Sequence, residues 1–105
     1  MHIVIFITAG STQEAGKIAK TLVEERLAAC VNMVDGVRSV YRWRQGIKEA
    51  TEVLLIAKST DEKLGDLTAR VKQIHSYKTP EIVAIGVRAG SSEYLEWITS
   101  SVVQP

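Results

Sequence analysis

The chain has 105 residues, which fits one domain over residues 1–105, because a second domain would have almost no core. Its net charge of +1 provides no dominant basic surface, so a dedicated nucleic-acid binder is disfavoured. The 46% apolar and 24% charged fractions are typical of a globular protein and exclude a disordered chain.

The single cysteine, Cys30, excludes an internal disulfide and indicates a reducing compartment. The first apolar run, residues 3–8, is too short for a signal-peptide core or a membrane span, and no basic residue precedes it. We therefore expect a cytoplasmic protein without a membrane partner or a nucleic-acid partner.

The N-terminal part predicts a strand followed by a helix. Residues 3–8 are rich in β-branched and aromatic side chains and end at Ala9-Gly10, as expected for a buried strand. Ser11-Thr12-Gln13-Glu14 has the spacing of a capping box, in which hydroxyl and carboxylate bind free N–H groups at a helix start. Apolar residues then recur at helical spacing up to Leu27, which predicts an amphipathic helix on the sheet.

The middle of the chain predicts a long hairpin. Residues from Cys30 to about Arg44 are dense in Val, Met, Tyr and Trp, and Gly36 within them indicates a bulge in one long strand. Gln45-Gly46 begins the predicted loop, and Glu52 to Lys58 returns as an apolar strand.

A second amphipathic helix is predicted next. Residues 59–62, Ser-Thr-Asp-Glu, repeat the capping-box spacing, and apolar residues follow at steps of three and four up to Ile74. Glu81 to Val87 is the last predicted strand, and a short helix from Tyr94 to Val102 ends the pattern.

This order predicts an α+β fold of the ferredoxin-like type, an antiparallel sheet with both long helices on one face. The usual strand order of that fold leaves the second and fourth strands at the edges. A long edge strand with exposed Tyr and Trp is an aggregation hazard. Because most soluble oligomers are symmetric, we expect another copy of the chain to cover it.

Three polar side chains are candidates for chemistry. His75 ends the second predicted helix, where it is either a capping residue or a ligand. Cys30 is favoured as a small hydrophobic residue over a reactive thiol, because no Lys, Arg or His adjoins it in sequence. Lys58 ends an apolar strand, where it either extends to water or holds an anion near a helix start.

Aromatic residues and missing motifs point away from catalysis. Tyr41, Trp43, Tyr94 and Trp97 are interface candidates, although core packing also explains such residues. The common nucleophile, zinc, P-loop and dinucleotide motifs do not occur in the sequence. Without a visible nucleophile and base pair, we expect a protein that is not an enzyme.

Several segments in the same order identify a resemblance. The chain resembles the CutA divalent-cation tolerance family from about Ile3 to Ile98 without a gap. The matching segments are Ile18–Asn32, Ser39–Trp43, Glu52–Lys58, Val71–Ile82 and Tyr94–Ile98.

The resemblance implies a homotrimer of ferredoxin-like subunits whose long hairpins pair between neighbours, similar to PII-type signalling trimers. It also implies tolerance of copper and other divalent ions, with no established reaction. By position, it places the family's characteristic polar and aromatic residues near clefts between subunits, and these are Tyr41, Trp43, Lys58, His75, Tyr77, Glu81, Tyr94 and Trp97.

Two binding hypotheses follow from the resemblance. In the first, the partner is a divalent metal, copper, with His75 as the best ligand and Glu81 as a hard-ligand companion. A cysteine and a second histidine of some members are Ile7 and Ile74 here, which leaves few soft ligands.

In the second hypothesis, the protein is a PII-like regulatory module that holds a small anion in the cleft between subunits. Lys58 is then the cation, Tyr77 the hydrogen-bond donor and Trp43 the stacking wall. A third hypothesis, an enzyme of the same fold, is the least favoured, because no nucleophile and base pair is visible.

Three positions depart from the family pattern. The usual His-Pro-Tyr is His75-Ser76-Tyr77 here, which removes a rigid backbone angle. The usual Trp-x-Gly-Lys is Trp43-Arg44-Gln45-Gly46, which moves the glycine by one place and suggests a different turn. Gly10 stands where a proline is common.

Overall fold

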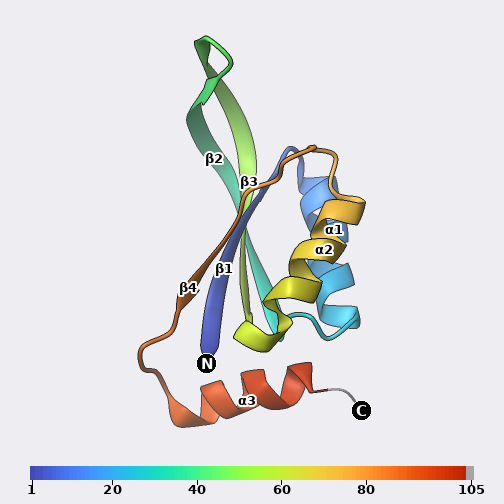
Figure 1. Cartoon of the computed structure of the whole chain (residues 1–105), viewed down its shortest axis with the longest axis vertical. Helices are drawn as coiled ribbons and strands as arrows, with labels where there is room; N and C mark the ends of the chain where they lie inside the picture. Colours follow the sequence, from blue (N-terminus) through green and yellow to red (C-terminus); the bar gives the residue numbers. More distant parts are fainter. Residues whose placement is uncertain (104–105) are drawn as a thin grey trace.

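Four antiparallel strands form one sheet that carries the two long helices on one side (Figure 1). The computed structural model describes residues 1–103. The elements are β1 (His2–Ala9), α1 (Thr12–Glu24), β2 (Cys30–Trp43), β3 (Gly46–Thr60), a 3-10 turn (Asp61–Lys63), α2 (Leu64–Ile74), β4 (Ile82–Gly86) and α3 (Ser92–Val102). The sheet order is β2-β3-β1-β4, so the predicted antiparallel α+β fold, with the second and fourth strands at the edges, is confirmed.

The core lies between the sheet and the two long helices. Ile3, Ile5 and Ile7 alternate along β1 and pack with the apolar stripes of α1 and α2. The fully buried helix residues include Ile18 and Leu22 of α1 and Leu67 and Val71 of α2. Each such side chain contributes about 1.5–3 kcal/mol when it leaves water. The predicted amphipathic stripes therefore attach both helices to the sheet.

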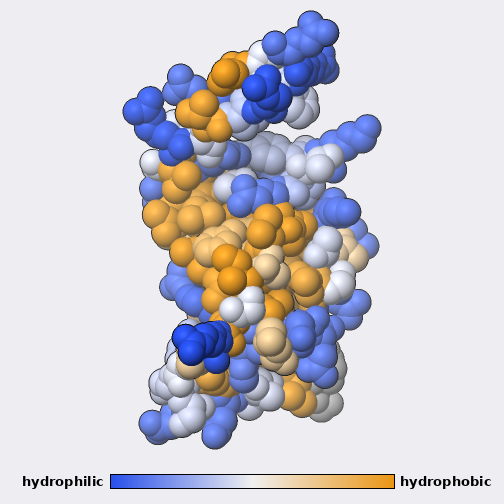
Figure 2. All heavy atoms as spheres, turned by 60° about the vertical axis from the view of Figure 1, so that its left-hand side comes forward, coloured by the Kyte–Doolittle hydropathy of each residue, from blue (hydrophilic) through white to orange (hydrophobic). Residues whose placement is uncertain are grey.

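The other side of the sheet, which we call the open face, has no helix across its centre. Figure 2 shows hydrophobic residues gathered across the middle of this side. Alternation and register place seven apolar residues there, Val4, Phe6, Val34, Leu54, Ile56, Val83 and Ile85, together with Thr8, Cys30, Asn32 and Lys58. Val83 is 51% and Ile85 is 55% exposed, so the apolar surface extends to the edge of β4.

β2 and β3 continue beyond the other strands as a two-stranded hairpin (Figure 1). Their register shifts between Val34 and Val37, and Gly36 has a φ of 72°, so the predicted bulge is confirmed. Beyond the bulge, Val40 is 65% and Ile47 is 70% exposed. A two-stranded ribbon of this kind is marginally stable by itself.

The turn of the hairpin differs from the prediction. Trp43 pairs with Gly46, so the turn residues are Arg44 and Gln45, and Gly46 already belongs to β3. Arg44 adopts a left-handed φ of 57°, which a glycine would adopt at lower cost. β3 also begins six residues before the predicted Glu52, because its first residues are exposed on both sides and show no apolar face.

The two predicted capping boxes have different outcomes. At the first, the Ser11 hydroxyl accepts the N–H of Glu14 at 3.1 Å and caps α1 as predicted. The second prediction is wrong, because Ser59 is buried in β3 and its hydroxyl donates to the Leu27 carbonyl at 2.7 Å. Pairing with β1 extends β3 to Thr60, and this tertiary pairing prevails over the local spacing.

Candidate functional site

His75 lies at the centre of a polar cluster beside the hairpin. It follows the last residue of α2, as predicted, and its side chain is fully buried. Its Nε2–H donates to the Thr8 carbonyl at 2.7 Å, and its Nδ1 accepts the backbone N–H of Tyr77 at 3.0 Å. A carbonyl only accepts and an amide only donates, so the proton is on Nε2 and the lone pair is on Nδ1. Both ring nitrogens are therefore engaged.

Glu14 reaches the same cluster from α1. Its Oε2 accepts the Ser76 N–H at 2.6 Å and lies 3.6 Å from Nδ1 of His75, and its Oε1 accepts the Gly10 N–H at 3.3 Å. Burial raises the pKa of this carboxyl, but the hydrogen bonds from Ser76 and Gly10 outweigh burial, so the pKa is lowered from its ordinary value of 4.5. The capping-box pattern accounts for Ser11 but not for the carboxylate of Glu14, which binds the N–H groups of Gly10 and Ser76 and not that of Ser11.

Tyr77 connects the cluster to the root of the hairpin. Its hydroxyl donates to Oε2 of Glu52 at 2.7 Å, and its ring centroid lies 4.7 Å from that of His75. Glu52 is only 8% exposed and pairs with Val37, the first paired residue after the bulge. Burial, the hydrogen bond to Glu52 and the nearby carboxylates raise the pKa of Tyr77 to about 12, so its phenol stays protonated at neutral pH.

We call Gly10, Glu14, Glu52, His75 and Tyr77 the hairpin-root cluster. These five residues come from α1, β3 and the loops that follow β1 and α2. Glu52 was a strand residue without a predicted role, because its sequence neighbours carry no sign of a tyrosine 25 positions away. The hydrogen bonds of the cluster therefore join loops and strands that the local sequence pattern does not connect.

Two departures from the family pattern add donors to this cluster. Gly10 and Ser76, where the family resemblance led us to expect prolines, each bind Glu14 through a backbone N–H that proline lacks. Gly10 also leaves room for Tyr77, because a Cβ at position 10 would lie 3.3 Å from the phenol oxygen. A proline at either position would remove one of the contacts that hold Glu14.

The predicted metal ligands do not meet in this structure. Within residues 1–103, exposed Glu81 forms no hydrogen bond or ion pair with His75, and no three His, Cys, Asp or Glu side chains are arranged to hold a metal ion. A metal ligand also needs a free lone pair, and the only lone pair of the His75 ring accepts the Tyr77 N–H. As folded here, the residues do not fit a copper site.

The predicted cleft residues separate into two groups within one copy. The first group is at the hairpin: Tyr41 and Trp43 lie on β2 beyond the bulge, and Tyr77 lies at the root. Tyr41 is near enough to Tyr77 to help raise its pKa. Trp43 is 52% exposed and has the Arg44 guanidinium 5.9 Å from its ring centroid.

The second group lies at the other end of β3. Lys58 pairs across the sheet with Cys30, and the Cys30 sulfur lies 3.5 Å from the Tyr94 hydroxyl. The Tyr94 and Trp97 rings of α3 lie beside each other, with centroids 5.4 Å apart. No Lys, Arg or His adjoins Cys30 along the chain, but the register of β2 on β3 places Lys58 opposite it across the sheet, a neighbour that sequence adjacency does not reveal.

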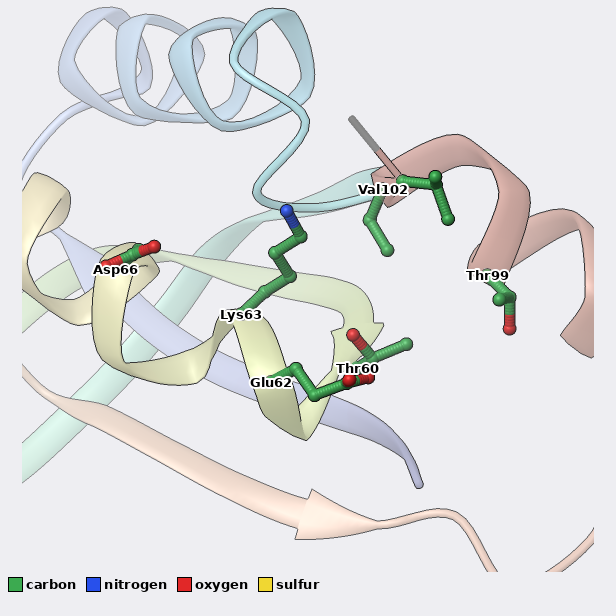
Figure 3. Close-up of a pocket in the computed structure, with 7 residues that line it drawn as sticks. Thr60, Glu62, Lys63, Asp66, Thr99 and Val102 are labelled. Carbon is green, nitrogen blue, oxygen red and sulfur yellow. The ribbon is translucent and has the colours of Figure 1, made fainter. Parts of the chain in front are cut away.

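A separate shallow pocket lies between the start of α2 and α3 (Figure 3). Its lining consists of Thr60, Glu62, Lys63, Asp66, Thr99, Val102 and Val103. Figure 3 shows Glu62 turned toward Thr60, whereas Lys63 points away from both. Because its charged side chains diverge, this pocket offers no convergent binding site, and the hairpin-root cluster is the better candidate.

Replacing the partly buried carboxylate of Glu14 tests the cluster. We expect Glu14→Gln to lower the free energy of unfolding by about 1–2 kcal/mol at neutral pH, because hydrogen bonds to a charged acceptor are stronger. The folded pKa of Glu14 is below 4.5, so this stabilisation is present above pH 4.5 and is lost as pH falls through the folded pKa. Urea unfolding at neutral pH and at about pH 3 measures it.

Glu24→Gln is the matched control, because Glu24 is exposed on the same helix and has no hydrogen bond through its side chain within residues 1–103. It should leave the free energy of unfolding nearly unchanged at both pH values. An equal loss for Glu14→Gln at both pH values would show that the carboxylate charge does not hold Ser76 and Gly10.

Comparison with known proteins gives one family. The family model for CutA1 divalent ion tolerance protein matches residues 3–101. The divalent-cation tolerance protein CutA of Thermus thermophilus is 49% identical over 98 residues, which cover 93% of this chain and 95% of the relative.

Solved structures of relatives agree with the sequence match. The divalent cation tolerance protein Cut A1 from Thermus thermophilus has a TM-score of 0.97 at 47% identity, covering 98% of this chain and 100% of that chain. The periplasmic divalent cation tolerance protein CutA from Archaeoglobus fulgidus has a TM-score of 0.95 at 45% identity, with the same coverage. Because sequence and fold match over nearly the whole chain, this protein belongs to the CutA1 divalent ion tolerance family.

Proposed function

We propose that this protein is a non-enzymatic homotrimer that acts in the response to divalent cations, copper in particular. The observation that carries the proposal is the open face, an apolar surface that continues onto an unsupported hairpin. Family membership is the reason to propose the cation response. The exposed apolar surface is the reason to propose self-association.

Further copies of the chain would bury what one copy leaves exposed. β2 and β4 are the two edges of the sheet, and free edges present unpaired N–H and C=O groups. Val34, Val83 and Ile85 are each about half exposed on the open face, and burying such surface yields about 25 cal/mol per Å². The free edges and the exposed apolar surface favour association with partner copies, and the family resemblance is the reason to propose three copies.

Binding is proposed in place of catalysis because the reactive groups within residues 1–103 are not paired for catalysis. The lone pair of His75 accepts an amide N–H, so the ring is no free base, and the Cys30 thiol contacts a tyrosine hydroxyl. Covalent catalysis needs a nucleophile within hydrogen-bond reach of a base. The family carries the name of a tolerance protein, which agrees with this proposal.

For copper we propose His75 as the ligand and Glu81 as its companion. Imidazole suits copper, and His75 is the only imidazole in the hairpin-root cluster. Because Nδ1 of His75 accepts the Tyr77 N–H in this structure, that hydrogen bond must break before Nδ1 binds a metal. Glu81 follows the same loop and is exposed, so it is free to approach when the loop changes.

The opposite end of β3 favours a second candidate function, a PII-like module that binds a small anion. Lys58 has its ammonium on the open face, in contact with Asn32, next to Cys30 and the aromatic pair of α3. The predicted partners Trp43 and Tyr77 lie at the hairpin, so a complete cleft needs the hairpin of a neighbouring copy.

The cytoplasm is the proposed location. The lone cysteine favours a reducing compartment. None of the helices in residues 1–103 combines the length and apolar character that crossing a bilayer requires. The Archaeoglobus relative is described as periplasmic, so cell fractionation is the measurement that decides the location of this chain.

Sedimentation should give a mass near three times 11.6 kDa. Ile85→Lys should weaken association by at least about 100-fold, because burying an unpaired charge costs several kcal/mol. Val23→Lys is the matched control, since Val23 is 42% exposed on α1, on the helix side of the sheet. A wild-type monomer at micromolar concentration, or equal effects of both variants, would contradict self-association through the open face.

Copper titration calorimetry tests the metal proposal. Wild type should bind Cu²⁺, and His75→Gln should lose at least about tenfold in affinity because an imidazole ligand is gone. His2→Gln replaces the other histidine, which lies at the N-terminus beside Thr99, and should bind as wild type does. If His75→Gln and wild type bind equally, His75 is not the ligand.

A thermal-shift screen with nucleotides and organic anions tests the second candidate. An anion held by Lys58 should raise the melting temperature of wild type by a few degrees at about 100 times its Kd. Lys58→Ala should abolish the shift, whereas Lys48→Ala, which removes an exposed lysine of the hairpin, should retain it. No shift with any anion, or a shift that survives Lys58→Ala, excludes this function for Lys58.

A further inference from the structure

Lys58 places a positive charge on the open face. Of the residues named above for that face, only Lys58 is charged, and none is Asp or Glu. Its neighbours across the sheet are Cys30 on β2 and Val4 on β1. Its ammonium contacts the side-chain oxygen of Asn32, a neutral acceptor, and it forms no ion pair within residues 1–103. No acid of the same copy therefore neutralises this charge.

Self-association through the open face would take the ammonium of Lys58 out of water. The side chain is already half-buried in one copy. A second copy laid over the open face would cover it together with the apolar residues around it. A buried charge without a partner of opposite sign strongly opposes association. Association therefore needs a negative group at Lys58, which comes either from the partner copy or from solution.

The side chains around Lys58 favour an anion from solution. An ammonium has three N–H groups, and the amide of Asn32, whose oxygen accepts one of them, carries two N–H groups of its own. The hydroxyl of Tyr94 lies 3.5 Å from the Cys30 sulfur, directly across from Lys58, and Tyr94 is 43% exposed. Donors outnumber acceptors in this group. A phosphate group, with several acceptor oxygens and a negative charge, matches that composition.

Carboxylates of a neighbouring copy are less well placed. Glu52 is only 8% exposed and already accepts the phenol of Tyr77. Asp35 lies in the bulge and Glu81 directly before β4, both toward the hairpin end of the sheet. Lys58 lies at the α3 end. A carboxylate of a partner copy would reach Lys58 only if that copy were reversed or shifted along most of the open face.

We propose that the open face binds a phosphate group at Lys58 and that the bound anion stabilises self-association. The anion supplies the negative charge that the ammonium needs once a second copy covers it. Binding and association then strengthen each other by the same factor. This inference rests on the proposed self-association, and it gives the second candidate function, an anion-binding module, a regulatory consequence.

The experiment is sedimentation equilibrium of the full-length protein, with inorganic phosphate titrated at an ionic strength held constant with sodium chloride. Wild type should associate at least about tenfold more tightly when phosphate is at about ten times its Kd. Lys58→Met keeps a long unbranched side chain and removes the charge. It should associate at least as tightly as wild type in saturating phosphate, and phosphate should have no effect on it.

Lys17→Met is the matched control, because Lys17 is exposed on α1, on the helix side of the sheet. It should respond to phosphate as wild type does. Lys58→Gln is the reserve variant if Lys58→Met does not fold, since it also removes the charge and should also lose the response to phosphate.

A second series replaces inorganic phosphate with adenosine monophosphate, which distinguishes a free phosphate from a phosphate ester. The Tyr94 and Trp97 rings lie beside the site and are each about half exposed. A larger effect of the nucleotide indicates that its base stacks on these rings. Equal effects indicate that the phosphate group alone is recognised, and both results support the site at Lys58.

The outcomes separate this inference from the proposed function. If wild type associates equally with and without phosphate, the inference is wrong and the proposed self-association stands. If Lys58→Met associates more weakly than wild type at every phosphate concentration, the inference is also wrong, because Lys58 then pairs with a carboxylate of the neighbouring copy. If wild type stays monomeric with and without phosphate, the proposed self-association fails and this inference fails with it.

Discussion

The sheet has two apolar faces, and the two long helices cover only one of them. On the covered face, the isoleucines of β1 pack against α1 and α2 in an ordinary core. On the open face, Val83 and Ile85 are half exposed beside the free edge of β4. Because apolar surface of this kind is rarely left to water, the proposed assembly follows from this asymmetry.

The hairpin adds a second constraint, because it needs a fixed direction to meet a partner. Its strands leave the sheet at the Gly36 bulge, where local twist and bending increase. Next to the bulge, the buried Glu52 is held by Tyr77, and Tyr77 is held by His75. Hydrogen bonds in a buried network of this kind reinforce one another and restrict the position of each member. The hairpin-root cluster thus links a loop to the direction of the hairpin.

Local patterns predicted most of the fold and little of the cluster. The capping residue Ser11, the bulge at Gly36 and the helix end at His75 follow from short-range chemistry, and all three are confirmed. The cap predicted at Ser59 is wrong because β1 pairs with β3 up to Thr60. His75 was identified as a site residue from its place at the helix end and Tyr77 through the family resemblance, but Glu14 and Glu52 were not identified as site residues. Their roles depend on partners that are distant along the chain.

The sequence by itself determined the element order, the apolar stripes, the edge strands and the family, because these depend on spacing between near neighbours or on long shared motifs. Tertiary structure alone decided which donor the lone pair of His75 accepts, which carboxylate receives the Tyr77 phenol, and that Lys58 faces Cys30. Those contacts join residues between 2 and 28 positions apart that only strand register and loop closure bring together. Hydrogen bonds act over about 3 Å, so a pattern of residue types does not specify them until the backbone is in place.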